Sequence, residues 1–177
     1  DAGGSYENLA AQFASSQYID FGKNLNFSLD PFADLSDIHT EGVDGEQALS
    51  VEGREKLIMI FNQMKIMASP TGDLTNFQSA EMLSYLVKMI EDEPSAASIT
   101  RYSELLEQDE DTRVSDIGKQ LKPYTVGGIY GALFDRRIAP PIDFDSRLIV
   151  VELNALKSQP EFQTVVLMSI IQQDRKS

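Results

Sequence analysis

The stretch that most constrains the fold is residues 147–173, where an apolar strand passes through a short turn into a helix that is apolar almost all round. Residues 148–151 are four consecutive aliphatic residues, typical of a strand covered on both faces in a parallel sheet. Ser158 and Glu161 have capping-box spacing, and Pro160 fits the first helical turn. A helix with so little polar surface is expected inside a larger body, so this stretch is typical of the middle of a domain.

Further strands are predicted in the first part of the chain. Residues 17–21 read as a short strand, and residues 26–32 as an extended piece that contains Pro31. Residues 33–47 carry acids, two glycines and no sustained periodicity, which indicates a surface loop. Strands therefore precede and follow a helical section, and this order predicts one sheet whose two parts are about a hundred residues apart.

Between these strands the pattern predicts a compact bundle of four helices. The first covers residues 50–68, and Thr75 with Gln78 forms a capping box for the second. Thr112 is expected to cap the fourth helix. The expected inner positions are Leu57, Ile60, Phe61 and Met64, then Leu83, Leu86, Val87 and Ile90, then Ile99, Tyr102, Leu105 and Leu106, and finally Val114, Ile117 and Leu121.

Composition narrows the class of protein. The 177 residues suffice for one domain with a sizeable core, and no apolar run approaches the roughly 20 residues that span a bilayer. A net charge of −13 repels phosphate backbones, so direct nucleic-acid binding is not expected. The chain has no cysteine, which is compatible with a reducing compartment, and we interpret it as cytoplasmic.

Most candidate catalytic residues have a simpler interpretation. The pairs Gly22-Lys23 and Gly118-Lys119 lack the upstream glycine and the hydroxyl residue of a phosphate-binding P-loop. His39 is the only histidine and is expected on a solvated loop. The acids of residues 107–111 read as a solvated turn, and Asp143 with Asp145 as polar residues before a strand. No catalytic residue and no metal ligand is predicted on this basis.

For three residues a functional role remains a hypothesis. Glu152 lies near the carboxyl end of a strand expected to be parallel, where α/β folds bind ligands. The alternative is a strand-end carboxylate that reaches water or a backbone amide. Arg136 and Arg137 could contact a neighbouring subunit's phosphates, or they are an ordinary surface pair.

Four short stretches together resemble the TraC-type conjugation ATPases, the largest energising subunits of type IV secretion systems. Asp1, Gly3, Ser5 and Tyr6 resemble the Asp-x-Gly-x-Ser-Tyr that follows the second core strand of that family. Leu29, Asp30, Pro31 and Phe32 resemble its Leu-Asn-Pro-Phe, with aspartate in place of asparagine. Gly131, Phe134 and Asp135 resemble its Gly-x-x-Phe-Asp, and Glu152, Leu153 and Leu156 its Glu-Leu-x-x-Leu.

The resemblance implies a helix-rich α/β fold, a partial RecA-like P-loop NTPase core that carries an all-helical subdomain. Residues 1–47 would be the first part of the core, residues 48–125 the helical subdomain and residues 126–177 the return to the core. The chain would lie between the P-loop and the magnesium-binding acidic strand. It is therefore expected to be structural and inactive alone, with no cofactor of its own.

For the intact protein the resemblance implies ATP and magnesium as cofactors, with Glu152 near the nucleotide and Arg136 and Arg137 at a subunit interface. It also implies other secretion subunits as partners, and a cytoplasmic place at the bacterial inner membrane. Exposed sheet edges predict self-association of the isolated chain. The rival hypothesis is a stand-alone acidic helical module that binds other proteins.

Overall fold

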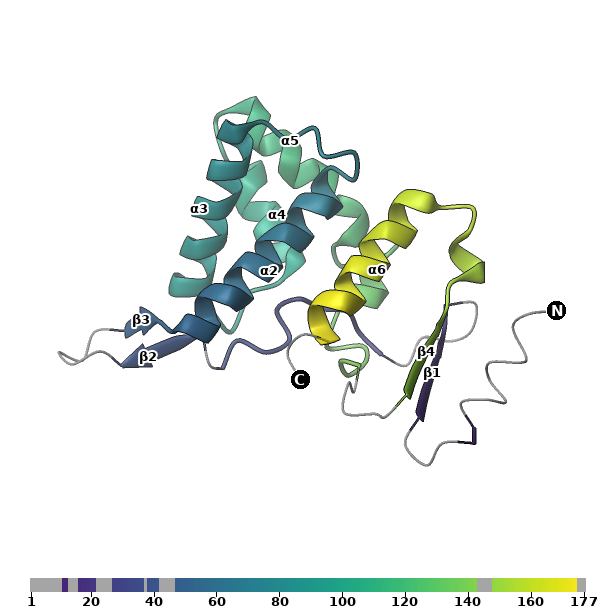
Figure 1. Cartoon of the computed structure of the whole chain (residues 1–177). Coiled ribbons are helices and arrows are strands. Elements are labelled where there is room, and N and C mark those ends of the chain that lie inside the picture. The colour runs from purple at the N-terminus through teal and green to yellow at the C-terminus, as the bar shows by residue number, and fades with distance from the viewer. Residues whose placement is uncertain are drawn as a thin grey trace.

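The structure, a computed structural model, describes residues 11–12, 16–21, 27–36, 38–41, 47–142 and 148–174 (Figure 1). The chain is helix-rich. In order along the chain, its elements are β1 (Ser16–Asp20), β2 (His39–Glu41), β3 (Gln47–Leu49), α2 (Val51–Ala68), α3 (Asn76–Asp92), α4 (Ile99–Glu107), α5 (Thr112–Leu121), the 3-10 turns η1 (Lys122–Tyr124) and η2 (Gly131–Phe134), β4 (Leu148–Glu152), η3 (Asn154–Leu156) and α6 (Pro160–Asp174).

The first and the last strand pair with each other across the whole helical section. β1 and β4 run parallel, in a register that joins Ser16 to Leu148 and Asp20 to Glu152. Ile19 is buried, and Val151, its partner in the register, packs partly buried against the same core. This pairing confirms the prediction of one sheet with distant parts. The predicted burial of residues 148–150 on both faces concerns side chains outside the described ones.

Helices α2 to α5 form the predicted bundle, which Figure 1 shows on one side of the sheet. Each of these four helices starts with a side-chain cap. The Ser50 hydroxyl accepts from the Gly53 N–H, and Thr75 and Gln78 form the predicted capping box. The cap of α5 is Asp111 rather than the predicted Thr112, because the Asp111 carboxylate accepts from the backbone N–H of Arg113 while also holding that residue's guanidinium.

The inner face of α3 differs from the prediction. Leu86 and Ile90 are buried as expected, but Met82 and Met89 accompany them, and Leu83 is 36% exposed. Both sets have helical spacing, so periodicity alone does not separate them. Contact with α4 selects the observed set, since the buried Tyr102 hydroxyl donates to the backbone carbonyl of Met82 at 2.6 Å.

The predicted surface loop at residues 33–47 contains part of a hairpin. β2 pairs antiparallel with β3, three residues each, and His39 begins β2 in register with Leu49 and is half-buried. The two short strands were not predicted, whereas the solvated role of His39 stays a prediction. The hairpin is anchored by Ile38, which is 1% exposed and whose carbonyl accepts from the Ser50 N–H.

Helix α6 lies between the bundle and the sheet in Figure 1 and begins at Pro160, which the sequence placed in its first turn. The capping box of Ser158 and Glu161 stays a prediction. Its buried face carries Phe162, Val165, Val166 and Ser169. The Ser169 hydroxyl accepts from the Gln63 side-chain amide of α2 at 2.7 Å. Leu167 and Ile171 are 40% and 47% exposed, so the described residues enclose only one face of this helix.

Three groups of predictions fall outside the described residues. These are the resembling stretch with Asp1, Gly3, Ser5 and Tyr6, the pair Gly22-Lys23, and the pair Asp143 and Asp145. Among the helices that the structure describes, none has the length and apolar character needed to cross a membrane.

Candidate functional site

The segments that enter and leave the bundle are fastened to each other. The backbone N–H of Ser28 donates to the carbonyl of Pro140 at 2.6 Å, and that of Leu29 to the carbonyl of Leu133 at 2.7 Å. The Ser28 hydroxyl also donates to the Leu133 carbonyl. We call residues 27–32 and 131–140 together the seam. Its buried apolar residues, which belong to the core, are Phe27, Leu29, Phe32, Leu133 and Phe134.

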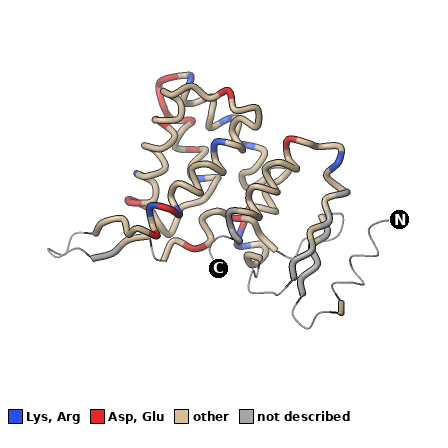
Figure 2. The backbone as a smooth tube through the Cα atoms, in the orientation of Figure 1, with Lys and Arg blue, Asp and Glu red and all other residues tan. Residues whose placement is uncertain are grey.

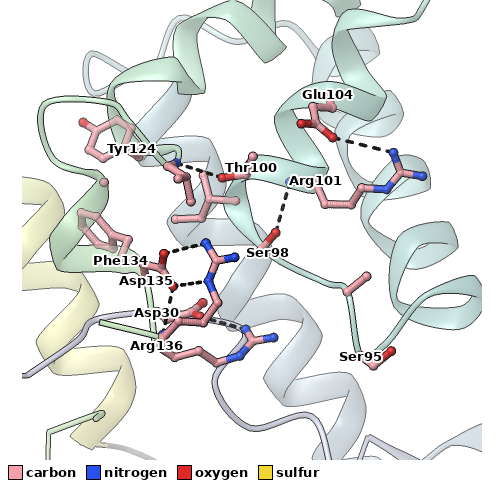
Figure 3. Close-up of a pocket in the computed structure, with 15 residues that line it drawn as sticks. Asp30, Ser95, Ser98, Thr100, Arg101, Glu104, Tyr124, Phe134, Asp135 and Arg136 are labelled. Carbon is pink, nitrogen blue, oxygen red and sulfur yellow. Dashed lines mark hydrogen bonds and ion pairs between the residues drawn. The ribbon is translucent and has the colours of Figure 1, made fainter. Parts of the chain in front are cut away.

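A buried ion pair lies in the seam. Asp30 is 3% exposed, and its Oδ2 accepts from Arg136 Nη1 at 2.8 Å while its Oδ1 accepts from the Phe32 N–H at 2.9 Å. Arg136 Nη1 also donates to the carbonyls of Phe32 and Ala97 at 3.2 Å each. Figure 3 shows this guanidinium between the Asp30 carboxylate and the segment before α4. One side chain thus joins three segments that are far apart in the sequence.

The pKa of Asp30 reflects two opposing influences. Burial removes water from the carboxylate and raises its pKa, whereas the Phe32 N–H and the Arg136 guanidinium lower it. Burial prevails, so the pKa of Asp30 lies above its ordinary value. The ionised carboxylate is therefore held at a cost in stability, which the pairing with Arg136 only partly offsets.

A cavity of about 670 Å³ opens beside this ion pair. Figure 3 shows its walls: the start of α4 with Ser98 and Thr100, the η2 end with Phe134, and the Asp30 and Arg136 pair. Ser98 caps α4 by accepting from the Arg101 N–H, and the Thr100 hydroxyl accepts from the Val126 N–H at 2.9 Å. The cavity therefore lies where the bundle meets the seam.

Each arginine that lines the cavity already has a carboxylate partner. Arg137 binds Asp135 through Nε at 2.8 Å and Nη2 at 2.6 Å, which lowers the pKa of Asp135. Arg101 binds Glu93 in the same two-point manner, at 2.8 and 2.7 Å, and so ties the end of α3 to α4. The cavity is thus balanced in charge, and its pairs are arranged to hold segments in place.

Glu152 ends β4, and its partner in the register is Asp20, which ends β1. Two acidic residues therefore stand at the carboxyl ends of adjacent parallel strands, the edge at which open α/β sheets bind ligands. Sequence reasoning singled out Glu152 but not Asp20. The signal for Asp20 was an acid near the end of the predicted strand at residues 17–21, and it points to a site only once the pairing with Glu152 is known.

The two predicted subunit-interface arginines differ in their surroundings. The side chain of Arg136 is 29% exposed and makes the internal contacts above, whereas that of Arg137 is 71% exposed. Their role at a subunit interface stays a prediction. Within the described ranges, the structure holds no group of three or more histidine, cysteine, aspartate or glutamate residues placed to bind a metal ion.

No protein-family model matches this sequence, and comparison with curated proteins finds no significant match.

Proposed function

We propose that this chain is the part of a TraC-type conjugation ATPase that lies between its two nucleotide-binding motifs. The observation that carries the proposal is the parallel pairing of β1 with β4 across an intervening helical bundle. A parallel pair requires a crossover connection, and in α/β proteins such pairs belong to larger sheets with helices on their faces. A bundle inserted between two such strands is what the resemblance implies for a partial RecA-like core.

The positions of the resembling stretches support the same proposal. The stretch Leu29 to Phe32 and the stretch Gly131 to Asp135 are about a hundred residues apart in the sequence, yet they contact each other in the seam. Asp30, the residue that departs from the family's asparagine, is paired there with Arg136. The third described stretch starts at Glu152, at the end of the paired strand.

The chain's own role in this proposal is structural. Its bundle would pack on the motor core, contribute to subunit contacts and transmit nucleotide-driven movement through the seam. The intact protein would use ATP and magnesium to energise pilus assembly and the transfer of DNA or protein, in contact with other secretion subunits at the inner membrane. The sequence contains no P-loop motif, so we assign no step of ATP chemistry to this chain.

The test has two arms. The first examines the coding sequence around this chain, where a Gly-Lys-Thr or Gly-Lys-Ser P-loop is expected about 30 residues upstream. The second measures ATP binding by calorimetry and phosphate release by malachite green, with magnesium and ATP. We expect neither binding nor turnover from the 177-residue chain. Turnover well above buffer, or upstream sequence that lacks a P-loop, would contradict the proposal.

A second candidate is a stand-alone acidic module that binds other proteins. It is favoured by the bundle's own core, in which Leu86, Tyr102, Leu106 and Ile117 are fully buried. It is also favoured by the surface, because Figure 2 shows acidic positions on each helix from α2 to α5. A start codon directly before Asp1 in the gene would support this candidate and contradict the first.

A further inference from the structure

A second cavity, of about 540 Å³, lies where the end of α2 and the turn η1 meet the start of α6. We call it the tyrosine–proline groove. Three prolines, two tyrosines and a phenylalanine give it flat apolar walls, and polar side chains stand among them. Its lining residues are Met67, Ala68, Pro70, Gln120, Pro123, Tyr124, Tyr130, Ser158, Gln159, Pro160, Glu161 and Phe162.

Tyr124 lines this groove with a hydroxyl that has no hydrogen-bond partner among the described residues. The residue is only 6% exposed, and its ring packs against those of Tyr130 and Phe134, at 5.5 and 5.6 Å between centroids. Figure 3 shows the hydroxyl directed away from the Asp30 and Arg136 pair. Buried polar groups nearly always form hydrogen bonds, so this hydroxyl can donate to an acceptor on a bound ligand.

The unpaired hydroxyl is a donor at neutral pH. Burial raises the pKa of Tyr124 to about 12, so the phenol keeps its proton. A second donor stands nearby: Gln159 uses its side-chain oxygen to accept from the Tyr130 hydroxyl at 2.7 Å, which leaves its amide nitrogen for another partner. The groove therefore offers hydrogen-bond donors between flat apolar rings.

An extended proline-rich peptide has the complementary chemistry. Proline has no N–H group, so such a peptide presents mainly backbone carbonyls, which are acceptors. Its polyproline conformation has no internal hydrogen bonds and is largely formed before binding, so little entropy is lost. Flat proline rings pack well against tyrosine and phenylalanine, as in the known aromatic grooves that bind this class of peptide.

The negative charge at the groove indicates which charge the ends of its ligand should carry. Glu161 is the one charged residue among the described residues of the lining, and the whole chain carries a net charge of −13. Both features attract a basic partner and repel an acidic one. We propose that the tyrosine–proline groove binds an extended proline-rich peptide with a basic flank, and that the Tyr124 hydroxyl donates to one of its backbone carbonyls.

The test uses the whole chain and a short fluorescein-labelled proline-rich peptide with arginines at one end, followed by fluorescence anisotropy. Saturable binding is expected. The same peptide with alanines in place of its prolines should bind at least tenfold more weakly, because it loses the preformed conformation and the ring contacts. Equal binding of the two peptides, or tighter binding of an amphipathic helical peptide of equal charge, would overturn the proposal.

The variant Tyr124→Phe isolates the hydroxyl. It keeps the ring and its packing, and should weaken peptide binding about fivefold, the typical worth of one hydrogen bond. It should also raise the midpoint of thermal unfolding, because it removes a buried unpaired polar group from the free protein. A purely structural tyrosine would not give these opposite effects, and unchanged peptide affinity would overturn the proposal.

Tyr102→Phe is the matched control. Tyr102 is also buried, but its hydroxyl already donates to the Met82 carbonyl and lies outside the groove. This variant should lower the unfolding midpoint and leave peptide binding unchanged. If both variants weakened binding equally, the Tyr124 effect would be a general loss of packing and the proposal would fail.

A second pair of variants tests the charge. Glu161→Gln should weaken binding of the arginine-flanked peptide two- to threefold and reduce its dependence on salt. Glu110→Gln removes the same charge from an exposed position outside the groove and should have little effect. Equal effects of the two substitutions would contradict the basic-flank part of the proposal.

Discussion

At the scale of single residues, Arg136 concentrates more long-range contacts than its position in a basic pair suggests. It reaches Asp30, 106 positions earlier in the chain, and the carbonyls of Phe32 and Ala97. Its guanidinium is planar and offers several donors in a fixed geometry, which lysine cannot reproduce. Arg136 therefore supplies side-chain hydrogen bonds that join the seam to the segment before α4.

Replacing Arg136 by methionine should lower the free energy of unfolding by about 3 kcal/mol at neutral pH. The substitution leaves the Asp30 carboxylate buried without its counter-ion and removes the donor from two carbonyls. Chemical denaturation with urea measures the loss. Adding Asp30→Asn to this variant should recover part of it, because the buried charge then disappears.

The neighbouring Arg137→Met is the control. That guanidinium is mostly exposed and pairs with Asp135, so we expect a loss of about 0–1 kcal/mol. Equal losses at the two positions would show that the Arg136 contacts do not form.

The Arg136→Met loss should shrink on acidification. The folded-state pKa of Asp30 lies above its ordinary 3.8, so this group's contribution to stability is fully present below that value and is lost as pH rises through the folded pKa. Without Arg136 the folded pKa rises further, and the carboxyl takes up a proton at a higher pH. Urea denaturation at neutral pH and at about pH 5 should show the gap between variant and wild type narrowing. A constant gap would contradict this account.

Sequence reasoning reached some of these residues and missed their partners. Glu152 and Arg136 were singled out from local patterns. Glu152 comes directly after an apolar strand, and Arg136 forms a basic pair with its neighbour in the sequence. Asp30 as the partner of Arg136, Asp20 as the register partner of Glu152, and the unpaired hydroxyl of Tyr124 depend on contacts between distant segments. No periodicity or motif within a short window encodes such contacts.

At the scale of elements, α4 and α5 approach so closely that one position requires glycine. A Cβ atom built on Gly118 would lie 2.6 Å from the carbonyl oxygen of Ser103 and 2.8 Å from the backbone nitrogen of Glu107. The Ser103 hydroxyl also donates to the Gly118 carbonyl at 2.8 Å. The two backbones therefore contact each other directly.

Gly118→Ala should destabilise the protein by about 2 kcal/mol, although alanine is the better helix former by about 1 kcal/mol. The clash with backbone atoms cannot be relieved by a side-chain rotation. The control is Lys119→Ala on the exposed side of α5, which should change the free energy of unfolding by less than about 0.5 kcal/mol. Thermal unfolding followed by circular dichroism measures both, and a stabilised Gly118→Ala would contradict the close approach.

The pairing of β1 with β4 can be tested by a disulfide, because the chain has no cysteine of its own. Gln17 and Ile149 are register partners, so Gln17→Cys with Ile149→Cys should form an intramolecular bond on oxidation. Gln17→Cys with Val151→Cys is two residues out of register, roughly 7–8 Å apart, and should not. Electrophoresis and mass spectrometry separate the outcomes. Equal bonding in both variants would contradict the parallel register.

Elements with strong local signals were predicted well. The Ser50 and Thr75 starts of α2 and α3 follow from the reach of a hydroxyl to a nearby amide, which needs no tertiary structure. The β2–β3 hairpin was missed because strands of three residues carry too little pattern. The exposure of Leu83 was missed because two overlapping helical faces were equally apolar and only packing against α4 selects one.

At the scale of the whole molecule, two features leave apolar or unpaired surface exposed. α6 exposes Leu167 and Ile171, and among the described strands β1 and β4 each have only one partner. Unpaired strand edges and apolar helix faces favour association with another copy. A net charge of −13 opposes it, since like copies repel.

Self-association should therefore increase with salt, which screens the repulsion. Light scattering at high protein concentration is expected to show a rise in mean mass from low salt to about 1 M sodium chloride. The double variant Leu167→Glu with Ile171→Glu should stay monomeric, whereas Ile58→Glu, also at an exposed apolar position but on α2, should associate like the wild type. A monomeric wild type at high salt would contradict the prediction.

The whole-molecule predictions were the least constrained by sequence. The helix-rich architecture and the joining of distant strands followed from the order of apolar runs. The RecA-like core stays a prediction, because a pair of strands is shared by many α/β arrangements and the sequence supplies motifs rather than topology. The partners and the transported substrate are recognised by surfaces, and hydrophobic periodicity in the sequence does not describe these surfaces.

The seam has a consequence for how such a chain can change over evolutionary time. Both ends of the bundle pass through the same small set of bonds at Ser28, Leu29, Leu133 and Pro140, and α6 holds the bundle a second time through the bond between Gln63 and Ser169. A different bundle with ends of matching geometry could be grafted there without rebuilding β1 and β4. Related proteins that keep these contacts can therefore differ in the helical bundle that lies between them.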